Sequence, residues 1–279
     1  MHKVRSYHAA AAPVKAKNNL MSNRLAQQLT TLASAYGAAE AEVVGAFFAV
    51  PRRKQDHLRW LKAQGFKEYS AIKPILDALT QLYSNIDNGI ARHDYTELTG
   101  KLADETKHAR LVMDLVEEIS GKKIKPRDLT WLPQDRKLAR VRGGYSKTYA
   151  GLLHGSAKVT SKEMRRKDEE LERAAITLTE GGGGALYQVC GRLKKPGIEE
   201  KIAAVFREIL QDELDHKDSG GRSLATLVKD QASFRRAAQI ICEVSRQRLR
   251  MRNEQFGFPL SEAQMKMLDE RARQSVGGL

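Results

Sequence analysis

The sequence predicts an all-α protein built on a four-helix bundle, with one long crossover connection and extra helices at both termini. Apolar residues recur at spacings of three and four along nearly the whole 279-residue chain, as the buried face of a helix requires. No segment alternates apolar and polar residues convincingly, as a half-buried strand would. Two helical hairpins are separated by residues 121–158, where prolines and glycines interrupt the helical pattern.

The first predicted element is an amphipathic stretch over residues 19–50, with a break around Tyr36 and Gly37. It stops at Pro51, because a proline is poorly tolerated inside a helix. We therefore divide the chain into three parts. They are a basic N-terminal arm with amphipathic helices (1–52), the helical bundle (53–258), and a short C-terminal helix with its tail (259–279).

The first hairpin of the bundle is predicted from its end signals. One helix covers residues 69–88 and is closed by Gly89, a residue favoured just past a helix C-terminus. The other opens at Asp94-Tyr-Thr-Glu97, which has the spacing of a capping box, and continues to Ser120, where Gly121 ends it. A short connection between two helices predicts that they are antiparallel neighbours.

The second hairpin follows the crossover. Thr160-Ser-Lys-Glu163 has the spacing of another capping box and predicts the start of a long helix that ends before Pro196. The next helix is predicted over residues 198–217. A final helical region over residues 224–256 and a short helix beyond Pro259 complete the chain.

The composition suits a globular protein of a reducing compartment. No run of apolar residues approaches the roughly 18 that are needed to cross a bilayer. Cys190 and Cys242 are the only cysteines and have no CxxC spacing, which argues against a disulfide scaffold or a zinc ribbon. We expect a cytoplasmic protein. An organellar location is the alternative, because residues 1–39 contain five Lys or Arg residues and no acidic one.

The formal net charge of +14 has two interpretations. A solvated basic face is the simpler one, since no aromatic residues are interleaved with the basic clusters as stacking platforms. The alternative is an anionic partner, either RNA or a membrane surface. The basic clusters include residues 52–54, 122–125, 136–142, 165–167, 194–195 and 246–252.

Two Glu-x-x-His pairs interrupt the apolar faces of two predicted bundle helices. Glu105 occupies a position of its helix where an apolar side chain belongs, and His108 lies one turn further on nearly the same face. Glu213 and His216 repeat this pattern on the later helix. The apolar residues that define the two faces are Leu98, Leu102, Ala109, Val112, Val116 and Ile119, and Ile202, Phe206 and Ile209.

Carboxylates and imidazoles that face one interior indicate a metal site. A buried carboxylate costs free energy unless it is paired or binds a metal, and two of them would repel each other without a cation between them. A pair of iron or manganese ions resolves this, and it leaves open coordination positions for dioxygen or water. The alternative is two core histidines with internal hydrogen bonds and solvated glutamates nearby.

Two more carboxylates are expected, one from each preceding helix of the hairpins. In the second hairpin Glu180 is the candidate, since it lies as far before Pro196 as Glu213 lies after it. The four glycines at 181–184 that follow it would allow close approach of a backbone or a substrate, or else mark a helix break. In the first hairpin we favour Asp77, with Glu68 as the alternative.

These residues resemble the ferritin-like superfamily of diiron and dimanganese carboxylate proteins, over residues 70–220. The resemblance depends on Glu105-Thr-Lys-His108, Glu180 and Glu213-Leu-Asp-His216. Residues 206–220 are most similar to the demethoxyubiquinone hydroxylase branch. The resemblance implies two iron ions, with manganese as the alternative metal, and dioxygen as the oxidant.

The predicted function is that of an O2-dependent diiron oxidase or hydroxylase acting on an unidentified small organic substrate, with a separate electron donor. Tyr187 is the candidate catalytic residue, in a redox or hydrogen-bonding role, with plain packing as the alternative; Tyr83 is a weaker candidate. Asp212 and Asp215 either hydrogen-bond a ligand histidine or lie on a solvated face. Two other functions stay open: ferroxidase or peroxide-consuming chemistry, and RNA binding or modification through the basic surface.

Overall fold

The structure is a computed structural model that describes residues 12–83, 92–145, 167–180, 184–216 and 224–277. Within these residues all regular secondary structure is helical, which confirms the predicted all-α class. The elements are α1 (Ala12–Phe48), α2 (Lys54–Tyr83), α3 (Arg92–Ser120), the 3-10 helix η2 (Pro126–Asp128), α4 (Pro133–Tyr145), α6 (Lys167–Glu180), α7 (Gly184–Gly191), α8 (Ile198–His216), α10 (Gln231–Gln255) and α11 (Glu262–Gln274).

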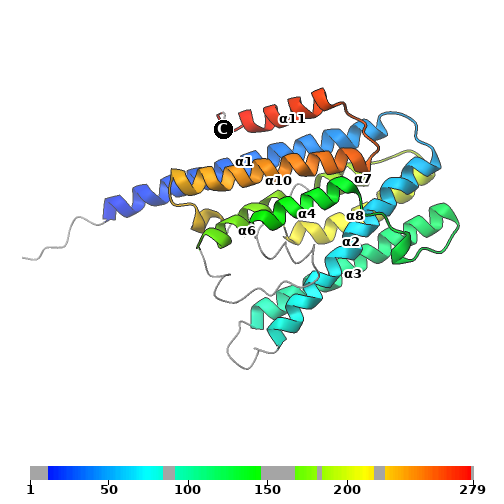
Figure 1. Cartoon of the computed structure of the whole chain (residues 1–279), viewed down its shortest axis with the longest axis horizontal. Coiled ribbons are helices and arrows are strands. Elements are labelled where there is room, and N and C mark those ends of the chain that lie inside the picture. Colours follow the sequence, from blue (N-terminus) through cyan, green and yellow to red (C-terminus); the bar gives the residue numbers. More distant parts are fainter. Residues whose placement is uncertain (1–11, 84–91, 146–166, 181–183, 217–223, 278–279) are drawn as a thin grey trace, which may run out of the picture.

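The helices pack in two groups (Figure 1). The long helix α1 lies along α10, and α11 packs against both of them. Helices α2 and α3 form a hairpin that crosses the first group at an angle, and α7 and α8 form a second pair that contacts it through α3 and α8. Helices α4 and α6 pack against α10. The two helical hairpins are therefore neighbours in space.

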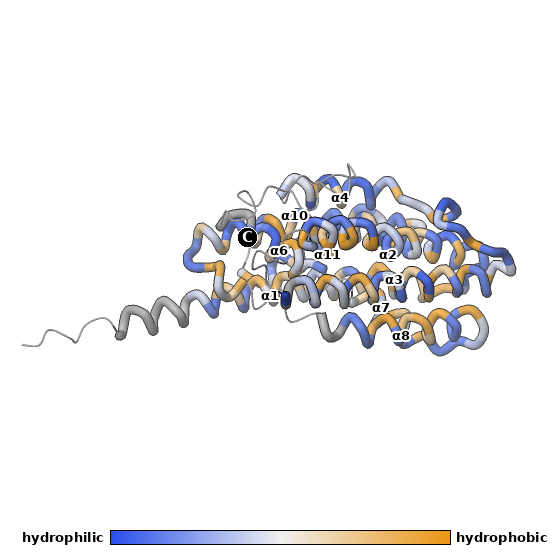
Figure 2. Tube along the Cα trace, turned by 90° about the horizontal axis from the view of Figure 1, so that it is seen from below, coloured by the Kyte–Doolittle hydropathy of each residue, from blue (hydrophilic) through white to orange (hydrophobic). Residues whose placement is uncertain are grey.

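Each group has its own apolar core. The first core lies among α1, α4, α6, α10 and α11, and includes Leu29, Ile176 and Ile241. The second lies among the end of α1 and helices α2, α3, α7 and α8, and includes Trp60 and Phe206. Figure 2 shows apolar and polar residues interleaved along the helices, as expected of amphipathic helices that each bury one face. Polar side chains meet where the two cores adjoin, and the candidate site lies there.

Two glycines lie at closely packed positions, Gly65 of α2 and Gly191 of α7. A Cβ atom at Gly65 of α2 would lie 3.1 Å from a side-chain carbon of Leu129 and 3.4 Å from one of Val112 on α3. A Cβ atom at Gly191 of α7 would lie 3.1 Å from a side-chain carbon of Arg207 on α8. A larger residue would require the side chains of Leu129 and Arg207 to move slightly, whereas the contact with Val112 would be an ordinary van der Waals contact. Gly121 ends α3 with a φ of +75°, as its position in the sequence predicts.

Several predicted helix ends differ from the structure. Helix α1 continues through Tyr36 and Gly37 without the predicted break, and Tyr36 is buried there. Helix α2 begins at Lys54 instead of near Tyr69, and it contains Pro74 in its interior. Helix α10 begins at Gln231 because Asp230 caps it by accepting a hydrogen bond from the backbone N–H of Ser233. The break at Pro51, the start of α8 and a short helix after Pro259 agree with the prediction.

The predicted long helix before Pro196 is represented by two elements. Helix α6 ends at Glu180, helix α7 begins at Gly184, and the glycines between them lie outside the described residues. The predicted capping box at Thr160–Glu163 also lies outside them. Helix α7 ends at Gly191, earlier than expected. Cys190 and Cys242 are both buried and form no disulfide. None of the described helices has the length and apolar character that a membrane span requires.

Candidate metal centre

Three potential metal ligands converge between α2 and α3. Glu68 comes from α2, and Glu105 and His108 come from α3. One donor atom from each lies within 4.8 Å of the other two, a spacing at which one cation could contact all three. Glu68 is 5% exposed and His108 is 1% exposed. Glutamate is seldom buried this deeply without a partner, so the cluster needs a physical explanation.

Helix α8 completes the surroundings of His108. The carboxylate Oδ2 of Asp212 lies 3.1 Å from Nε2 of His108, and it also accepts a hydrogen bond from Nζ of Lys107 at 2.9 Å. Because an ionised carboxylate only accepts hydrogen bonds, Nε2 carries the proton of this contact. On the other side of the ring, Nδ1 lies 3.8 Å from Oε1 of Glu213. Asp212 therefore fixes the orientation of the imidazole, as the partner of a ligand histidine does.

The other ring nitrogen of His108 tests whether these residues suit a metal ion. Nδ1 is buried and has no hydrogen-bond partner among the described residues. A buried polar atom without a partner is rare, because its lost hydration is not replaced. A histidine with one nitrogen bound to a carboxylate and the other directed at carboxylate oxygens has the donor arrangement of a metal ligand. The side chains that surround His108 thus fit a metal ion.

Glu68 is held by two hydrogen bonds to one of its oxygens. The hydroxyl of Tyr187 on α7 donates to Oε1 at 3.0 Å, and the side-chain amide of Gln64 donates to the same atom. The second oxygen is then the one that could bind a metal. Burial raises the pKa of Tyr187 well above its ordinary value, and the charges of Glu68, Glu213 and Glu105 raise it further. The phenol therefore stays protonated and acts as a donor.

The electrostatics of the cluster are unfavourable when no cation is present. Burial raises the pKa of Glu105 well above its ordinary value, and the negative charges of Glu68, Glu213 and Glu180 raise it further. Carboxyl groups that share a small volume cannot all ionise at neutral pH unless positive charge lies between them. A metal ion would supply that charge and would reverse the direction of the pKa shift.

The structure places Glu68, and not the favoured Asp77, beside Glu105 and His108. Asp77 is partly exposed and accepts hydrogen bonds from Nζ of Lys73 at 2.7 and 2.9 Å, whereas Glu68 is in the cluster. Helix α2 ends at Tyr83 and α3 begins at Arg92, so the midpoint of the hairpin falls between residues 87 and 88. Antiparallel helices then place Glu68 level with residue 107 and Asp77 level with residue 98. Glu68 therefore lies at the level of Glu105 and His108 along the hairpin when the observed helix ends are used.

The remaining predicted residues occupy different positions. Glu213 faces His108, whereas the side chains of Asp215 and His216 lie outside those that the structure describes. Glu180 ends α6 and is partly exposed, with Oε1 3.7 Å from Nη2 of Arg142. It does not join Glu68, Glu105 and His108, although its charge contributes to the raised pKa of Glu105. Tyr83, at the end of α2, is 70% exposed, so its side chain is not buried in the cluster.

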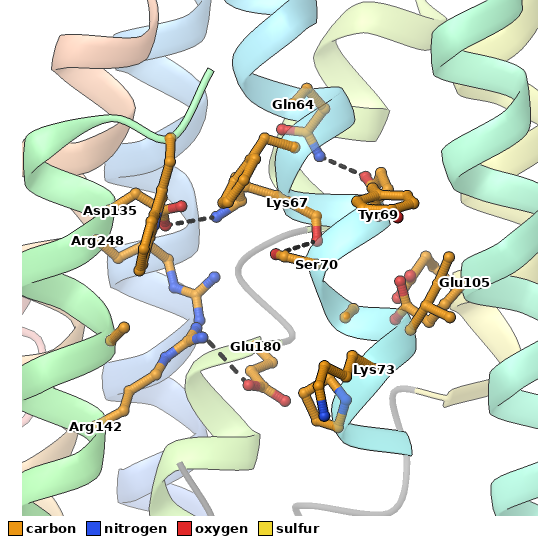
Figure 3. Close-up of a pocket in the computed structure, with 18 of the residues that line it drawn as sticks. Gln64, Lys67, Tyr69, Ser70, Lys73, Glu105, Asp135, Arg142, Glu180 and Arg248 are labelled. Carbon is orange, nitrogen blue, oxygen red and sulfur yellow. Dashed lines mark hydrogen bonds and ion pairs between the residues drawn. The ribbon is translucent and has the colours of Figure 1, made fainter. Parts of the chain in front are cut away.

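A cavity of about 750 Å³ opens beside the cluster. Glu68, Glu105, Glu213 and Tyr187 line one part of it. Figure 3 shows Glu105 on one side of the cavity and basic side chains on the opposite side. The polar and charged residues that line the rest of it are Gln64, Lys67, Tyr69, Ser70, Lys73, Asp77, Asp135, Arg142, Glu180, Arg248 and Arg252, together with Phe66 and Trp131 among the less polar ones.

Two arginines of the predicted basic surface are instead buried near the site. Arg252 is 2% exposed and forms an ion pair with the buried Glu40 of α1 at 2.5 Å. It also donates to the side chain of Gln64, which donates to Glu68. Arg248 lies one turn earlier on α10 and is also buried. One pattern in the sequence indicates the burial of Arg248. It lies on the same helix face as the apolar residues Ile241, Val244 and Met251, although many of its neighbours are basic.

Comparison with family models, with curated proteins and with solved structures gives no significant match to this chain.

Proposed function

We propose that this protein is a non-haem diiron oxidoreductase that uses dioxygen to oxidise or hydroxylate a small organic substrate. The observation that carries the proposal is the convergence of Glu68, Glu105 and His108, with donor atoms within 4.8 Å of one another. Nδ1 of His108 has no hydrogen-bond partner among the described residues, and Asp212 contacts the opposite ring nitrogen, Nε2. Manganese is the alternative metal.

The helix arrangement supports a ferritin-like bundle as the scaffold. Helices α2 and α3 form one hairpin and α7 and α8 another, and α3 contacts α8. The ligands proposed here come from facing helices of such a bundle, with one carboxylate from α2, a Glu-x-x-His pair from α3 and Glu213 from α8. Glu180 and His216 complete the proposed ligand set from the sequence pattern. The segment with η2 and α4 is then the long crossover.

Metal ions bound at this site would supply the electrons for the reduction of dioxygen. The residues of the chain have separate tasks. Glu68, Glu105, Glu213 and His108 hold the ions, while Asp212 keeps the His108 ring in its orientation through the 3.1 Å contact. The hydroxyl of Tyr187 holds a proton 3.0 Å from Oε1 of Glu68, next to the cavity. Because its pKa is raised, the phenol keeps this proton and acts by hydrogen bonding, which fixes the orientation of Glu68.

The size of the cavity favours an organic substrate over simple iron oxidation. About 750 Å³ lies within the range of small-molecule binding sites, whereas oxidation of an iron ion needs room only for the ion and dioxygen. Phe66 and Trp131, whose rings stack with centroids 5.4 Å apart, give part of the cavity wall an apolar surface. An organic molecule could bury its apolar part against this surface.

The proposal is tested by oxygen uptake. Protein loaded with ferrous iron without air, and then exposed to dioxygen, should consume dioxygen in proportion to the protein concentration. Glu105→Ala should lose this uptake, because it removes a proposed ligand. Asp114→Ala is the control, since Asp114 lies on the same helix and forms an exposed ion pair with Arg110. Equal uptake by wild type and Glu105→Ala would contradict the proposal.

A further inference from the structure

The wall of the cavity opposite Glu105 is cationic, and its charges come from three helices. Lys67 is on α2, Arg142 is on α4 and Arg248 is on α10, and all three line the cavity. Figure 3 shows Arg142 and Arg248 beside each other, away from Glu105. Cations placed this close repel one another, so their convergence needs a compensating negative charge.

Two of these cations already face a carboxylate. Nζ of Lys67 lies 3.6 Å from Oδ1 of Asp135, and Nη2 of Arg142 lies 3.7 Å from Oε1 of Glu180. Both ion pairs are drawn in Figure 3. These contacts are near the limit of an ion pair, and they leave one cation of the wall, Arg248, without a carboxylate of its own.

Arg248 is the cation of this wall that forms no ion pair among the described residues, although the charges of Glu40 and Glu180 act on it from a greater distance. It is 6% exposed, and no carboxylate of the described residues lies within 4.0 Å of its nitrogens. Its hydrogen bond is the long one, 3.5 Å, from Nη2 to Oγ1 of Thr179, and its Nε is buried without a partner in the described part of the chain. A guanidinium group has five N–H donors, and burial of its Nε–H without an acceptor is unfavourable because the lost hydration is not replaced. A ligand that supplies the missing acceptor would remove this cost.

The guanidinium group of Arg248 keeps its charge at neutral pH. Burial, together with the positive charge of the neighbouring Arg142, lowers the pKa of Arg248 to about 10. The group therefore remains protonated at pH 7 and attracts an anion. Lys67 is similar, because burial lowers its pKa to about 8 while Asp135 opposes the shift.

We propose that Arg248, together with Arg142 and Lys67, binds the carboxylate of an organic acid whose body extends along the cavity toward Glu105 and Tyr187. The pairing on this wall favours a monoanion, since Lys67 and Arg142 already face Asp135 and Glu180, and Arg248 alone of the three forms no ion pair within the described residues. A planar carboxylate also matches the two parallel N–H donors of a guanidinium group. The apolar ring surface of Phe66 and Trp131 then accommodates the hydrocarbon part.

The assignment of this acid as the substrate rests on the proposed function, whereas the binding of the anion does not. An acid anchored at Arg248 would present its far end to the carboxylate cluster. Binding of the carboxylate fixes the orientation of the molecule and lets the enzyme select which carbon lies nearest the metal ligands. Neutral molecules of the same shape would leave Arg248 unpaired and bind more weakly.

The test uses 4-fluorobenzoate and its neutral isostere 4-fluorobenzamide, observed by fluorine NMR with the full-length protein. Both the metal-free and the iron-loaded protein are titrated, so that carboxylate binding to iron is separated from binding to Arg248. We expect the metal-free wild type to bind the benzoate at least about tenfold more tightly than the benzamide. Arg248→Gln should lose this preference. Arg250→Gln is the matched control, since Arg250 is exposed on the same helix two residues away.

The outcomes are separable. Equal binding of the two probes to the wild type, or a preference that persists in Arg248→Gln, would overturn the proposal. Tighter binding of inorganic phosphate than of the benzoate would overturn the assignment to a monocarboxylate. If Arg248→Gln does not fold, Arg142→Gln should still reduce the preference, and the benzoate should raise the wild-type unfolding temperature more than the benzamide does. Iron content, measured separately, reports on the proposed function, and the anion result stands even if the protein binds no iron.

Discussion

Nε2 of His108 lies 3.1 Å from Oδ2 of Asp212, across the interface between α3 and α8. This contact leaves Nδ1 of His108 facing Glu213 at 3.8 Å with no hydrogen bond within the described residues. An unsatisfied buried polar atom costs about 1–3 kcal/mol. His57 also has a buried Nδ1 without a partner among the described residues, but only His108 lies with Glu68 and Glu105 in a group of potential metal ligands there. The relationship between these two residues therefore links the packing of two helices to the chemistry proposed for the site.

Asp212→Asn should weaken metal binding without removing a ligand. The amide can present its NH2 group to Nε2, which favours the wrong tautomer of His108, and the expected loss of metal affinity is about 10- to 100-fold. Equilibrium titration with ferrous or manganous ions under a chelator buffer measures it. Asp212→Glu restores a carboxylate and should recover part of the affinity. Asp114→Asn on the exposed face of α3 should change nothing, and equal affinities for all four proteins would contradict the orienting role of Asp212.

Tyr187→Phe should destabilise the metal-free protein by about 1–2 kcal/mol, because the buried Oε1 of Glu68 loses a hydrogen bond. The phenylalanine ring keeps its packing against Phe206, whose ring centroid lies 5.9 Å away, so the fold should be retained. Urea unfolding with near-ultraviolet circular dichroism measures the change. Tyr83→Phe is the control and should lie within about 0.5 kcal/mol of the wild type, because Tyr83 is 70% exposed. A Tyr187→Phe protein as stable as this control would show that the hydrogen bond is not formed.

Glu105 should make the metal-free protein less stable as the pH rises above the ordinary pKa of a glutamic acid. The folded-state pKa of Glu105 is raised, so between the unfolded and folded pKa values the folded protein binds more protons than the unfolded chain. The free energy of unfolding then decreases with increasing pH across this window. Glu105→Gln removes the titrating group and should flatten the profile and stabilise the metal-free protein at pH 7. Urea unfolding of both proteins at a series of pH values from 4 to 8 checks this, because their difference separates Glu105 from groups such as His57, whose lowered pKa acts in the opposite direction. A difference that does not change with pH would contradict the crowding of carboxylates.

Arg252→Met should be strongly destabilising. It leaves the carboxylate of Glu40, which is 1% exposed, without the guanidinium group that binds it. Breaking a buried ion pair on one side costs about 3–5 kcal/mol, whereas removing both charges costs much less. The double variant Glu40→Leu with Arg252→Met should therefore recover most of the loss in thermal or urea unfolding. For comparison, Arg271→Ala at the exposed pair with Glu42 should cost at most about 1 kcal/mol. A double variant no more stable than Arg252→Met alone would argue against the ion pair as the cause.

Local signals in the sequence predicted the elements that local chemistry determines. Gly121 ends α3 because its φ is positive, and Pro51 separates α1 from α2. The Glu-x-x-His position of Glu105 and His108 was also readable, since both interrupt a face that is otherwise apolar and that is buried from Ala109 to Ile119. These features depend on residues within one or two helical turns, which sequence spacing describes directly.

Features that depend on tertiary packing were not readable in this way. The choice of Glu68 over Asp77 depends on where α2 ends, because a shift of the hairpin midpoint by about four residues moves the matching position by about eight, which is roughly two helical turns. Arg248 and Arg252 lie in a run of basic residues that resembles a solvated face. Their burial depends on distant partners, such as Glu40 for Arg252, which is 212 residues away along the chain. No local pattern encodes that pairing.

The central claim is that Glu68, Glu105 and His108 bind a metal, and the metal content of three matched proteins tests it most directly. Wild type, Glu68→Ala and Asp77→Ala are produced with iron supplied, and iron per chain is measured after removal of loosely bound metal. We expect roughly two irons per chain, as in diiron carboxylate proteins, for the wild type and Asp77→Ala, and a large loss for Glu68→Ala. A wild-type protein that folds and binds no iron or manganese, or a Glu68→Ala protein that retains the full content, would contradict the claim.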